Sequence, residues 1–171
     1  MKIIAIVAVD KKWAIGKENK LLYHIPIDMK FFKEATSKQI VVYGYNTLLS
    51  FPKQQPLPNR INIVLTSKNL DIENLIVAHS IEDLMKILRT LKANYDDKDV
   101  YICGGASVYK QLLPMCDEVM VTRIDAETDD ADTYFPNLDK DENWELAQDY
   151  LTTQDTTSGL VVSFCTYKKR W

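Results

Sequence analysis

The sequence predicts an α/β fold: a largely parallel sheet with flanking helices and an antiparallel hairpin at the carboxyl end. Apolar β-branched runs recur along the chain, helical patterns lie between several of them, and the tail changes to two longer strand patterns around a polar turn. Strands of a parallel sheet are buried on both faces, which makes them nearly continuous apolar runs. Strands that alternate with helices are typical of α/β proteins.

Six segments have the composition of doubly buried strands. They are residues 3–9, 40–43, 61–65, 75–78, 100–103 and 119–124. Helical patterns lie among them, at residues 26–36, 45–49, 81–91 and 107–113. Pro26 suits a first helical position, and in the third pattern Leu84, Ile87, Leu88 and Leu91 recur at helical spacing.

The tail predicts a hairpin at one edge of the sheet, with strands 144–150 and 160–167 around the polar segment 152–159. Two other stretches, residues 10–22 and 51–59, have no regular pattern. Long loops in a compact domain often form lids or binding walls. Both stretches are therefore candidates for such a role.

Length and composition predict one globular domain over residues 1–171, of which 46% are apolar and 26% charged. The net charge of -3 argues against nucleic acid as a partner. No apolar run approaches the roughly 20 residues of a membrane span. Cys103, Cys116 and Cys165 lack a CxxC spacing, so neither a disulfide framework nor a metal site is predicted and a reducing cytoplasm is favoured. Nothing in the sequence demands more than a monomer.

Asp28 is the most informative single residue. At 3.6 residues per turn it shares one face of the predicted helix with Phe31, Phe32 and Ala35, where a core residue would lie. An acid held there must be paired, neutralised by a raised pKa, or reserved for a ligand. The alternative is an acid in the first turn that merely complements the helix dipole.

Glycines follow two of the predicted strands. Gly104 and Gly105 lie between a strand and a helix, and Gly44 precedes the short helix that carries Asn46 and Thr47. Glycine lets a backbone approach a ligand closely, and free N–H groups at a helix start bind phosphate. Neither junction has the GxGxxG or P-loop pattern. Together they predict a phosphate or diphosphate site, although two ordinary turns remain the alternative.

Five segments in register resemble dihydrofolate reductases over essentially the whole chain. They are AVDKKWAIGKENKLLYHIPIDMKFFKEAT, VVYGYNTLLSF, PLPNRINIVLTS, ICGGASVYKQLLP and VTRIDAETDDADTYFP. The resemblance implies a three-layer fold with an eight-stranded, mostly parallel sheet. It also implies reduction of 7,8-dihydrofolate to tetrahydrofolate with NADPH, and antifolate inhibitors as further ligands.

The resemblance implies three residues near the chemistry. Asp28 would hydrogen-bond the amide-like edge of the pterin and promote its protonation, and Thr122 would support that carboxylate. Tyr23 stands where the family usually has Trp, so its ordered water and lid packing could differ. Arg60 would take the α-carboxylate of the substrate's glutamate, a task suited to a planar fork of donors. The walls around the pterin and aminobenzoyl groups would be Ile4, Ile6, Val7, Phe32 and Leu57.

The resemblance also implies a cofactor site. Ala8, Ile15 and Gly16 would contact the nicotinamide, with Cys103 and Tyr109 nearby, and residues 10–22 would form the lid over the rings. The diphosphate would be held by Gly44, Asn46, Thr47, Gly104, Gly105, Ala106, Ser107 and Val108. Leu65, Thr66 and Ser67 would hold the adenosine end.

Tyr23 is one of three departures from the family pattern, and the other two, at Tyr45 and Ala106, concern the cofactor. Tyr45 stands where a basic residue commonly faces the 2′-phosphate of NADPH, and Ser107 replaces a frequent arginine, so the preference for NADPH over NADH is less secure than reductase activity. Lys68, with Ser67 and Asn46, could supply the phosphate contacts. Ala106 adds a methyl group to the glycine turn.

Two competing interpretations remain open. A pyrimidine reductase of riboflavin synthesis shares the architecture and the use of NADPH, but it predicts a phosphoribosyl pocket instead of the pair Asp28 and Arg60. A catalytically silent relative would bind nucleotide or folate without turnover.

Overall fold

The computed structural model describes residues 1–18 and 20–171, without the side chain of Tyr150. The predicted lid, residues 10–22, includes Asn19, which lies outside the described residues. None of the described helices is long and apolar enough to cross a bilayer.

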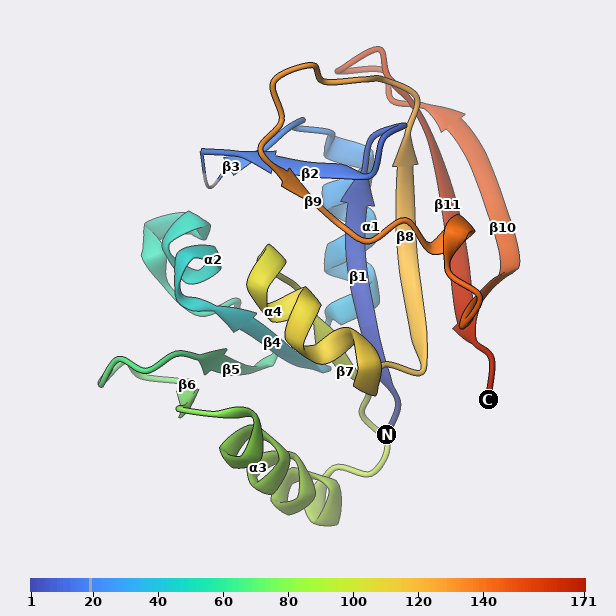
Figure 1. Ribbon diagram of the computed structural model, residues 1–171. Coiled ribbons are helices and arrows are strands. Elements are labelled where there is room, and N and C mark those ends of the chain that lie inside the picture. Colours follow the sequence, from blue (N-terminus) through green and yellow to red (C-terminus); the bar gives the residue numbers. More distant parts are fainter. Residues whose placement is uncertain (19) are drawn as a thin grey trace.

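Within the described residues, one sheet of eight strands has the order β10-β11-β8-β1-β7-β4-β5-β6 (Figure 1). Its strands are β1 (Ile3–Val9), β4 (Ile40–Gly44), β5 (Ile61–Leu65), β6 (Leu75–Ala78), β7 (Val100–Ile102), β8 (Glu118–Ile124), β10 (Trp144–Gln154) and β11 (Val161–Lys169). Neighbouring strands from β8 to β6 are parallel, and β11 and β10 add an antiparallel hairpin beside β8. The predicted fold class is therefore confirmed.

Four α-helices flank the sheet in the described chain. They are α1 (Pro26–Thr36), α2 (Tyr45–Ser50), α3 (Ile81–Asn94) and α4 (Ala106–Leu112), with short 3-10 turns η1 (Pro52–Gln54), η2 (Leu113–Met115) and η3 (Leu138–Lys140). The start of α3 is fixed by Ser80, whose hydroxyl accepts a hydrogen bond from the Asp83 amide at 3.0 Å. Pro26 opens α1 as predicted.

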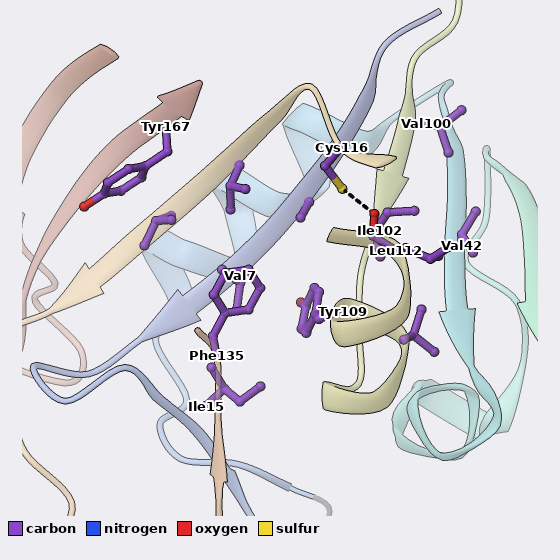
Figure 2. Close-up of a cluster of buried hydrophobic side chains, with 14 of the residues drawn as sticks. Val7, Ile15, Val42, Val100, Ile102, Tyr109, Leu112, Cys116, Phe135 and Tyr167 are labelled. Carbon is purple, nitrogen blue, oxygen red and sulfur yellow. Dashed lines mark hydrogen bonds between the residues drawn. The ribbon is translucent and has the colours of Figure 1, made fainter. Parts of the chain in front are cut away.

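The two faces of the sheet carry separate apolar cores. On one face, Val7 of β1, Val42 of β4 and Ile102 of β7 pack beneath Tyr109 and Leu112 of α4 (Figure 2). The opposite core contains Ile4, Ile6, Val41, Tyr43, Leu48, Val64 and Tyr101, with Phe31 and Phe32 of α1 packed against it. Side chains alternate between the faces of a strand, so β1 contributes to both cores.

A second, smaller sheet corrects the prediction that residues 10–22 are irregular. It consists of β2 (Ala14–Lys17), β3 (Lys20–Leu21) and β9 (Thr133–Tyr134) in the order β3-β2-β9. Strands of two to four residues are too short to show a period, so no alternation could be detected. In Figure 1 this sheet crosses the carboxyl end of β1.

The carboxyl-terminal hairpin is longer than predicted, because β10 continues to Gln154 instead of ending at residue 150. The register between β10 and β11 shifts twice, between Leu146 and Gln148 and between Asp149 and Leu151. Such irregularities interrupt the two-residue alternation by which a strand is detected in a sequence. The turn between the strands is correspondingly shorter.

Candidate active site

Asp28 lies in the first turn of α1 and faces the sheet. Its Oδ1 accepts a hydrogen bond of 2.6 Å from the hydroxyl of Thr122, which is 2% exposed on β8. The start of α1 is held by Asp155, whose Oδ1 accepts a hydrogen bond of 3.1 Å from the Ile27 amide. The helix thus presents the carboxyl group beside the carboxyl end of β8.

The surroundings of Asp28 favour its protonated form. Burial raises the pKa of this carboxyl group above its ordinary value, and the Thr122 hydrogen bond opposes that shift only in part. Within the described chain, Oδ2 receives no hydrogen bond from another residue. This oxygen is available to a ligand, and the alternative that Asp28 only complements the helix dipole does not account for its partner on β8.

Most of the residues predicted to form the apolar walls of the substrate site lie together. Ile4 and Ile6 of β1 belong to the same core as Phe32 of α1 and Leu57, on the face that Asp28 also occupies. Val7 is a correction, because its side chain belongs to the opposite core, below α4. Successive residues of a strand point to opposite faces, so Val7 cannot line the same wall as its neighbour.

Arg60 lies beyond the far end of α1. Its guanidinium donates hydrogen bonds to the Thr36 hydroxyl at 2.9 Å, to the Pro58 carbonyl at 2.9 Å and to the Lys33 carbonyl at 3.4 Å. It also lies 6.0 Å from the ring centroid of Phe32. Burial lowers the pKa of this guanidinium, opposed by the neighbouring Cys103. The group is positioned by protein contacts at one end of the apolar wall.

Asn62 was not predicted to matter, yet it positions the segment before β5. Its side chain donates to the Leu57 carbonyl at 2.8 Å and accepts from the Leu57 amide at 2.9 Å and the Tyr43 hydroxyl at 2.7 Å. The residue is 1% exposed. The sequence did contain a signal for this role, because Asn62 is a single amide side chain in the apolar run INIVL and buried polar groups form hydrogen bonds.

The two glycine junctions lie side by side at the carboxyl ends of β4 and β7. The Gly44 amide donates to the Gly104 carbonyl at 2.9 Å, and a Cβ on Gly105 would lie 3.7 Å from the Thr47 hydroxyl. Gly104 has a φ of +112°, a conformation that favours glycine. Asn46 on α2, and Ala106, Ser107 and Val108 at the start of α4, flank these junctions.

The predicted adenosine residues form a neighbouring group after β5. Leu65 ends that strand, Thr66 and Ser67 follow, and the Lys68 ammonium lies 5.1 Å from the ring centroid of Tyr45 at the start of α2. Lys68 and Tyr45 are far apart in the sequence and adjacent in the fold. The structure thereby brings a positive charge to the place where Tyr45 stands instead of a basic residue.

The residues predicted for the nicotinamide lie around the carboxyl end of β1. The Tyr109 hydroxyl donates to the Ile6 carbonyl at 2.6 Å, and Tyr109 and Ile15 of β2 share one core. Ala8 packs in a third apolar cluster, with Tyr23 and Ile27. The remaining members are Gly16 on β2 and Cys103 after β7, the latter with its thiol pKa raised by burial.

Three comparisons with known proteins agree. Residues 2–169 match the family model of dihydrofolate reductase. The chain is 32% identical over 166 residues to dihydrofolate reductase of Bacillus subtilis (strain 168), covering 96% of this chain and 93% of that protein. It is 34% identical over 149 residues to dihydrofolate reductase of Haemophilus influenzae, covering 87% of each. The solved structure of dihydrofolate reductase from Enterococcus faecalis, complexed with NADP(H) and RAB-propyl, has a TM-score of 0.83 and 36% identity, covering 99% and 97% of the two chains.

This chain belongs to the dihydrofolate reductase family. Dihydrofolate reductases are NADPH-dependent oxidoreductases, and the chain accordingly reduces dihydrofolate with NADPH. The matching family model is not that of the pyrimidine reductases, so the first competing interpretation loses its support.

The residues present fit the cofactor of dihydrofolate reductases. A Cβ on Gly105 would contact only the Thr47 hydroxyl, so the backbone there is open to close approach by a diphosphate. Lys68 provides a positive charge within reach of the same edge of the sheet. The described residues contain no group of three or more His, Cys, Asp and Glu side chains arranged to hold a metal ion.

Proposed function

We propose that Asp28 promotes protonation of the pterin while 7,8-dihydrofolate is reduced to 5,6,7,8-tetrahydrofolate. The observation that carries this role is the Thr122 hydrogen bond, which engages one carboxyl oxygen and leaves the other available to the amide-like edge of the pterin. A carboxyl group with a raised pKa retains a proton closer to neutral pH than an exposed aspartate. Asp28 is therefore suited to a catalytic role, with Thr122 as its hydroxyl partner.

The other proposed substrate contacts follow the length of α1. Ile4, Ile6, Phe32 and Leu57 would enclose the pterin and aminobenzoyl groups by apolar contact. Arg60 would bind the α-carboxylate of the glutamate, because a planar guanidinium offers donors in a fixed fork. Antifolate inhibitors would contact the same apolar residues and the carboxyl group of Asp28.

NADPH, when bound, supplies the hydride that is added to the pterin. The chain's own residues would orient the two rings and exclude water, a contribution that is large when the reacting atoms are held in contact. Ala8, Ile15, Gly16, Cys103 and Tyr109 would lie around the nicotinamide. The junctions at Gly44 and Gly104–Gly105, with Asn46, Thr47 and residues 106–108, would hold the diphosphate, while Leu65, Thr66, Ser67 and Tyr45 would lie at the adenosine.

Lys68 would pair with the 2′-phosphate of NADPH. Support comes from its position over the Tyr45 ring, which directs the ammonium toward the start of α2. Its charge would compensate for the tyrosine and for Ser107 at two places where the family commonly has basic residues. This contact would give the chain its preference for NADPH over NADH.

We also propose that residues 1–171 form a single domain that acts as a monomer in the cytoplasm. One continuous sheet joins the first and last strands, which supports the single domain. The cysteines Cys103, Cys116 and Cys165 are free, as a reducing compartment would keep them.

The test is an absorbance assay of NADPH oxidation with dihydrofolate. The parent chain and the exposed control Asp97→Asn should turn over at similar rates, whereas Asp28→Asn should lose most activity at neutral pH. Binding of both ligands without any turnover of the parent would favour the silent relative. A fully active Asp28→Asn variant would remove Asp28 from the catalytic role.

A further inference from the structure

The segment after β8 lies alongside the predicted lid over much of its length. The Lys11 amide donates to the Ala126 carbonyl at 3.0 Å, and the Glu18 amide donates to the Asp132 carboxylate at 2.9 Å. Between these contacts, β9 pairs with β2 (Figure 1). The position of the lid therefore depends on the conformation of residues 125–134.

Thr128 contacts both ends of this lid. Its amide donates to Oδ2 of Asp10 at 3.0 Å, and its hydroxyl lies 2.6 Å from the hydroxyl of Tyr23. Asp10, the first residue of the lid, is 3% exposed, and Tyr23 is the residue that directly follows the lid. A single residue outside the lid thus joins its beginning to its end.

The two residues that Thr128 contacts, Asp10 and Tyr23, in turn contact residues near the proposed site. Oδ1 of Asp10 accepts hydrogen bonds from the Lys12 and Ala14 amides at 2.8 and 2.9 Å, so this carboxylate fixes the turn that leads into β2. On the other side, the Tyr23 ring packs in one apolar cluster with Ala8 and with Ile27, the neighbour of Asp28. The Tyr23 ring consequently packs against the same apolar cluster as one residue proposed for the nicotinamide and one residue of the helix that carries the acid.

We infer that Thr128 is a positioning residue, whose hydroxyl orients the Tyr23 ring and whose amide restrains the turn at Asp10 that leads into β2. This inference rests on the proposed function for its kinetic consequence, although not for its structural one. The Tyr23 hydroxyl, at the position where the family usually has an indole, acquires a direct protein partner. A hydroxyl pair of this length restrains both segments, because breaking it in a partly buried place leaves two polar groups to be solvated again.

The first experiment measures amide hydrogen exchange in the unliganded chain, for Thr128→Val, Thr128→Ser and Tyr23→Phe. Valine keeps the shape of threonine without the hydroxyl, and serine keeps the hydroxyl. Loss of one hydrogen bond should accelerate exchange at the Ala14 and Thr128 amides about fivefold in Thr128→Val and in Tyr23→Phe. Thr128→Ser should exchange like the parent. The matched control is Thr90→Val on α3, whose hydroxyl donates to the Lys86 carbonyl of the same helix at 3.2 Å and has no other hydrogen bond within the described residues.

The second experiment measures single-turnover hydride transfer with saturating NADPH. Thr128→Val should slow this step about fivefold, and Thr128→Ser should restore it. The double variant Thr128→Val/Tyr23→Phe should be no slower than the slower single variant, because both changes remove the same contact.

Parent-like exchange at Ala14 and Thr128 in Thr128→Val would overturn the inference, as would failure of Thr128→Ser to restore hydride transfer. A parent chain without turnover would defeat the proposed function instead, and the exchange data would still decide the role of Thr128.

Discussion

The carboxyl group of Asp28 is placed where its charge is costly. It belongs to the inward face of α1, and its hydrogen-bond partner within the described residues is the Thr122 hydroxyl rather than a cation. A cation would lower the pKa of a carboxyl group, whereas burial beside a hydroxyl leaves the pKa raised. The residue is thereby adapted to proton transfer more than to stability.

Replacement of Asp28 by Asn tests that adaptation. The variant cannot titrate, so kcat at neutral pH should fall by about 10²- to 10⁴-fold, the range that general acid–base catalysis contributes. Turnover of the parent should decline as the pH rises through the raised pKa of Asp28, and the variant should lack this decline. The measurement is the pH profile of kcat for NADPH oxidation. Identical profiles for parent and variant would contradict the proposal.

The same substitution should increase stability. Because the pKa of Asp28 is raised in the folded state, that state holds the proton more tightly than the unfolded chain does, and stability falls as the pH rises through the folded pKa. Asparagine has no such penalty. The Tm of Asp28→Asn should therefore exceed that of the parent above the raised pKa, and the difference should shrink as the pH falls below the ordinary pKa of an aspartate, where the carboxyl group is protonated in both the folded and the unfolded chain. A difference that stays constant across this range would argue against the raised pKa.

Elements with an uninterrupted apolar run or a clear helical period were predicted best. The bounds of β1, β5, β6 and α1 agree with those expected, because each combines a clear period or apolar run with a break at both ends. The bounds of α3 and β10 were set too short, since the polar last turn of one and the register shifts of the other obscure their periods. The smaller sheet depends on pairing between segments distant in the sequence, which no local pattern reveals.

The residues of the candidate site also divide into those that the sequence predicted and those that it did not. Helical spacing indicated Asp28, glycines at strand ends indicated the two junctions, and the family resemblance indicated Arg60. The fold places Asp28 and Arg60 along α1, whereas the glycine junctions lie at the carboxyl ends of β4 and β7. Asn62 and Thr128 were missed, because each acts through a hydrogen bond to a segment that only the tertiary structure brings close. Val7 was assigned to the wrong face, although the alternation of β1 already separated it from Ile4 and Ile6.

Arg60 connects the end of α1 to the segment before β5, and this placement predicts a selective kinetic effect. Arg60→Ala should raise KM for dihydrofolate about 10- to 100-fold, the equivalent of about 1.5–3 kcal/mol for hydrogen bonds to a charged group. The contact is remote from the reacting atoms, so kcat should change much less. Steady-state kinetics check this, with the exposed Arg89→Ala as control. An unchanged KM would remove Arg60 from the substrate site.

The pair of Lys68 and Tyr45 joins the loop after β5 to α2, and it predicts cofactor preference. Lys68 is exposed, so its contact with a phosphate should be modest, and Lys68→Ala should raise KM for NADPH about two- to fivefold. KM for NADH, which lacks the 2′-phosphate, should not change. The effect should weaken with added salt, whereas Lys92→Ala on α3 should affect neither cofactor. Equal changes for both cofactors would place the 2′-phosphate elsewhere.

At the scale of the molecule, the site lies where elements with different roles meet. The parallel strands end at one edge of the sheet, α1 and the core of Ile4 and Ile6 form one wall there, and α4 with the glycine junctions forms another. The smaller sheet crosses the same edge (Figure 1). Ligands at carboxyl ends of parallel strands are common in α/β folds. Cofactor binding should therefore stabilise the whole fold against unfolding.

Thermal unfolding with and without NADPH measures that coupling. A ligand at about 100 times its Kd stabilises the folded state by about 2.7 kcal/mol, which for a chain of this size corresponds to a Tm increase of roughly 5–10 °C. Gly105→Ala should impair cofactor binding without changing the stability of the fold. The added methyl group meets only the Thr47 hydroxyl, at 3.7 Å, and Gly105 has an ordinary φ of -78°. Without NADPH, its Tm should match the parent's, but the increase with NADPH should be lost, since the methyl group lies where the diphosphate approaches the backbone. A variant that gains as much Tm from NADPH as the parent would show that the cofactor does not contact this junction.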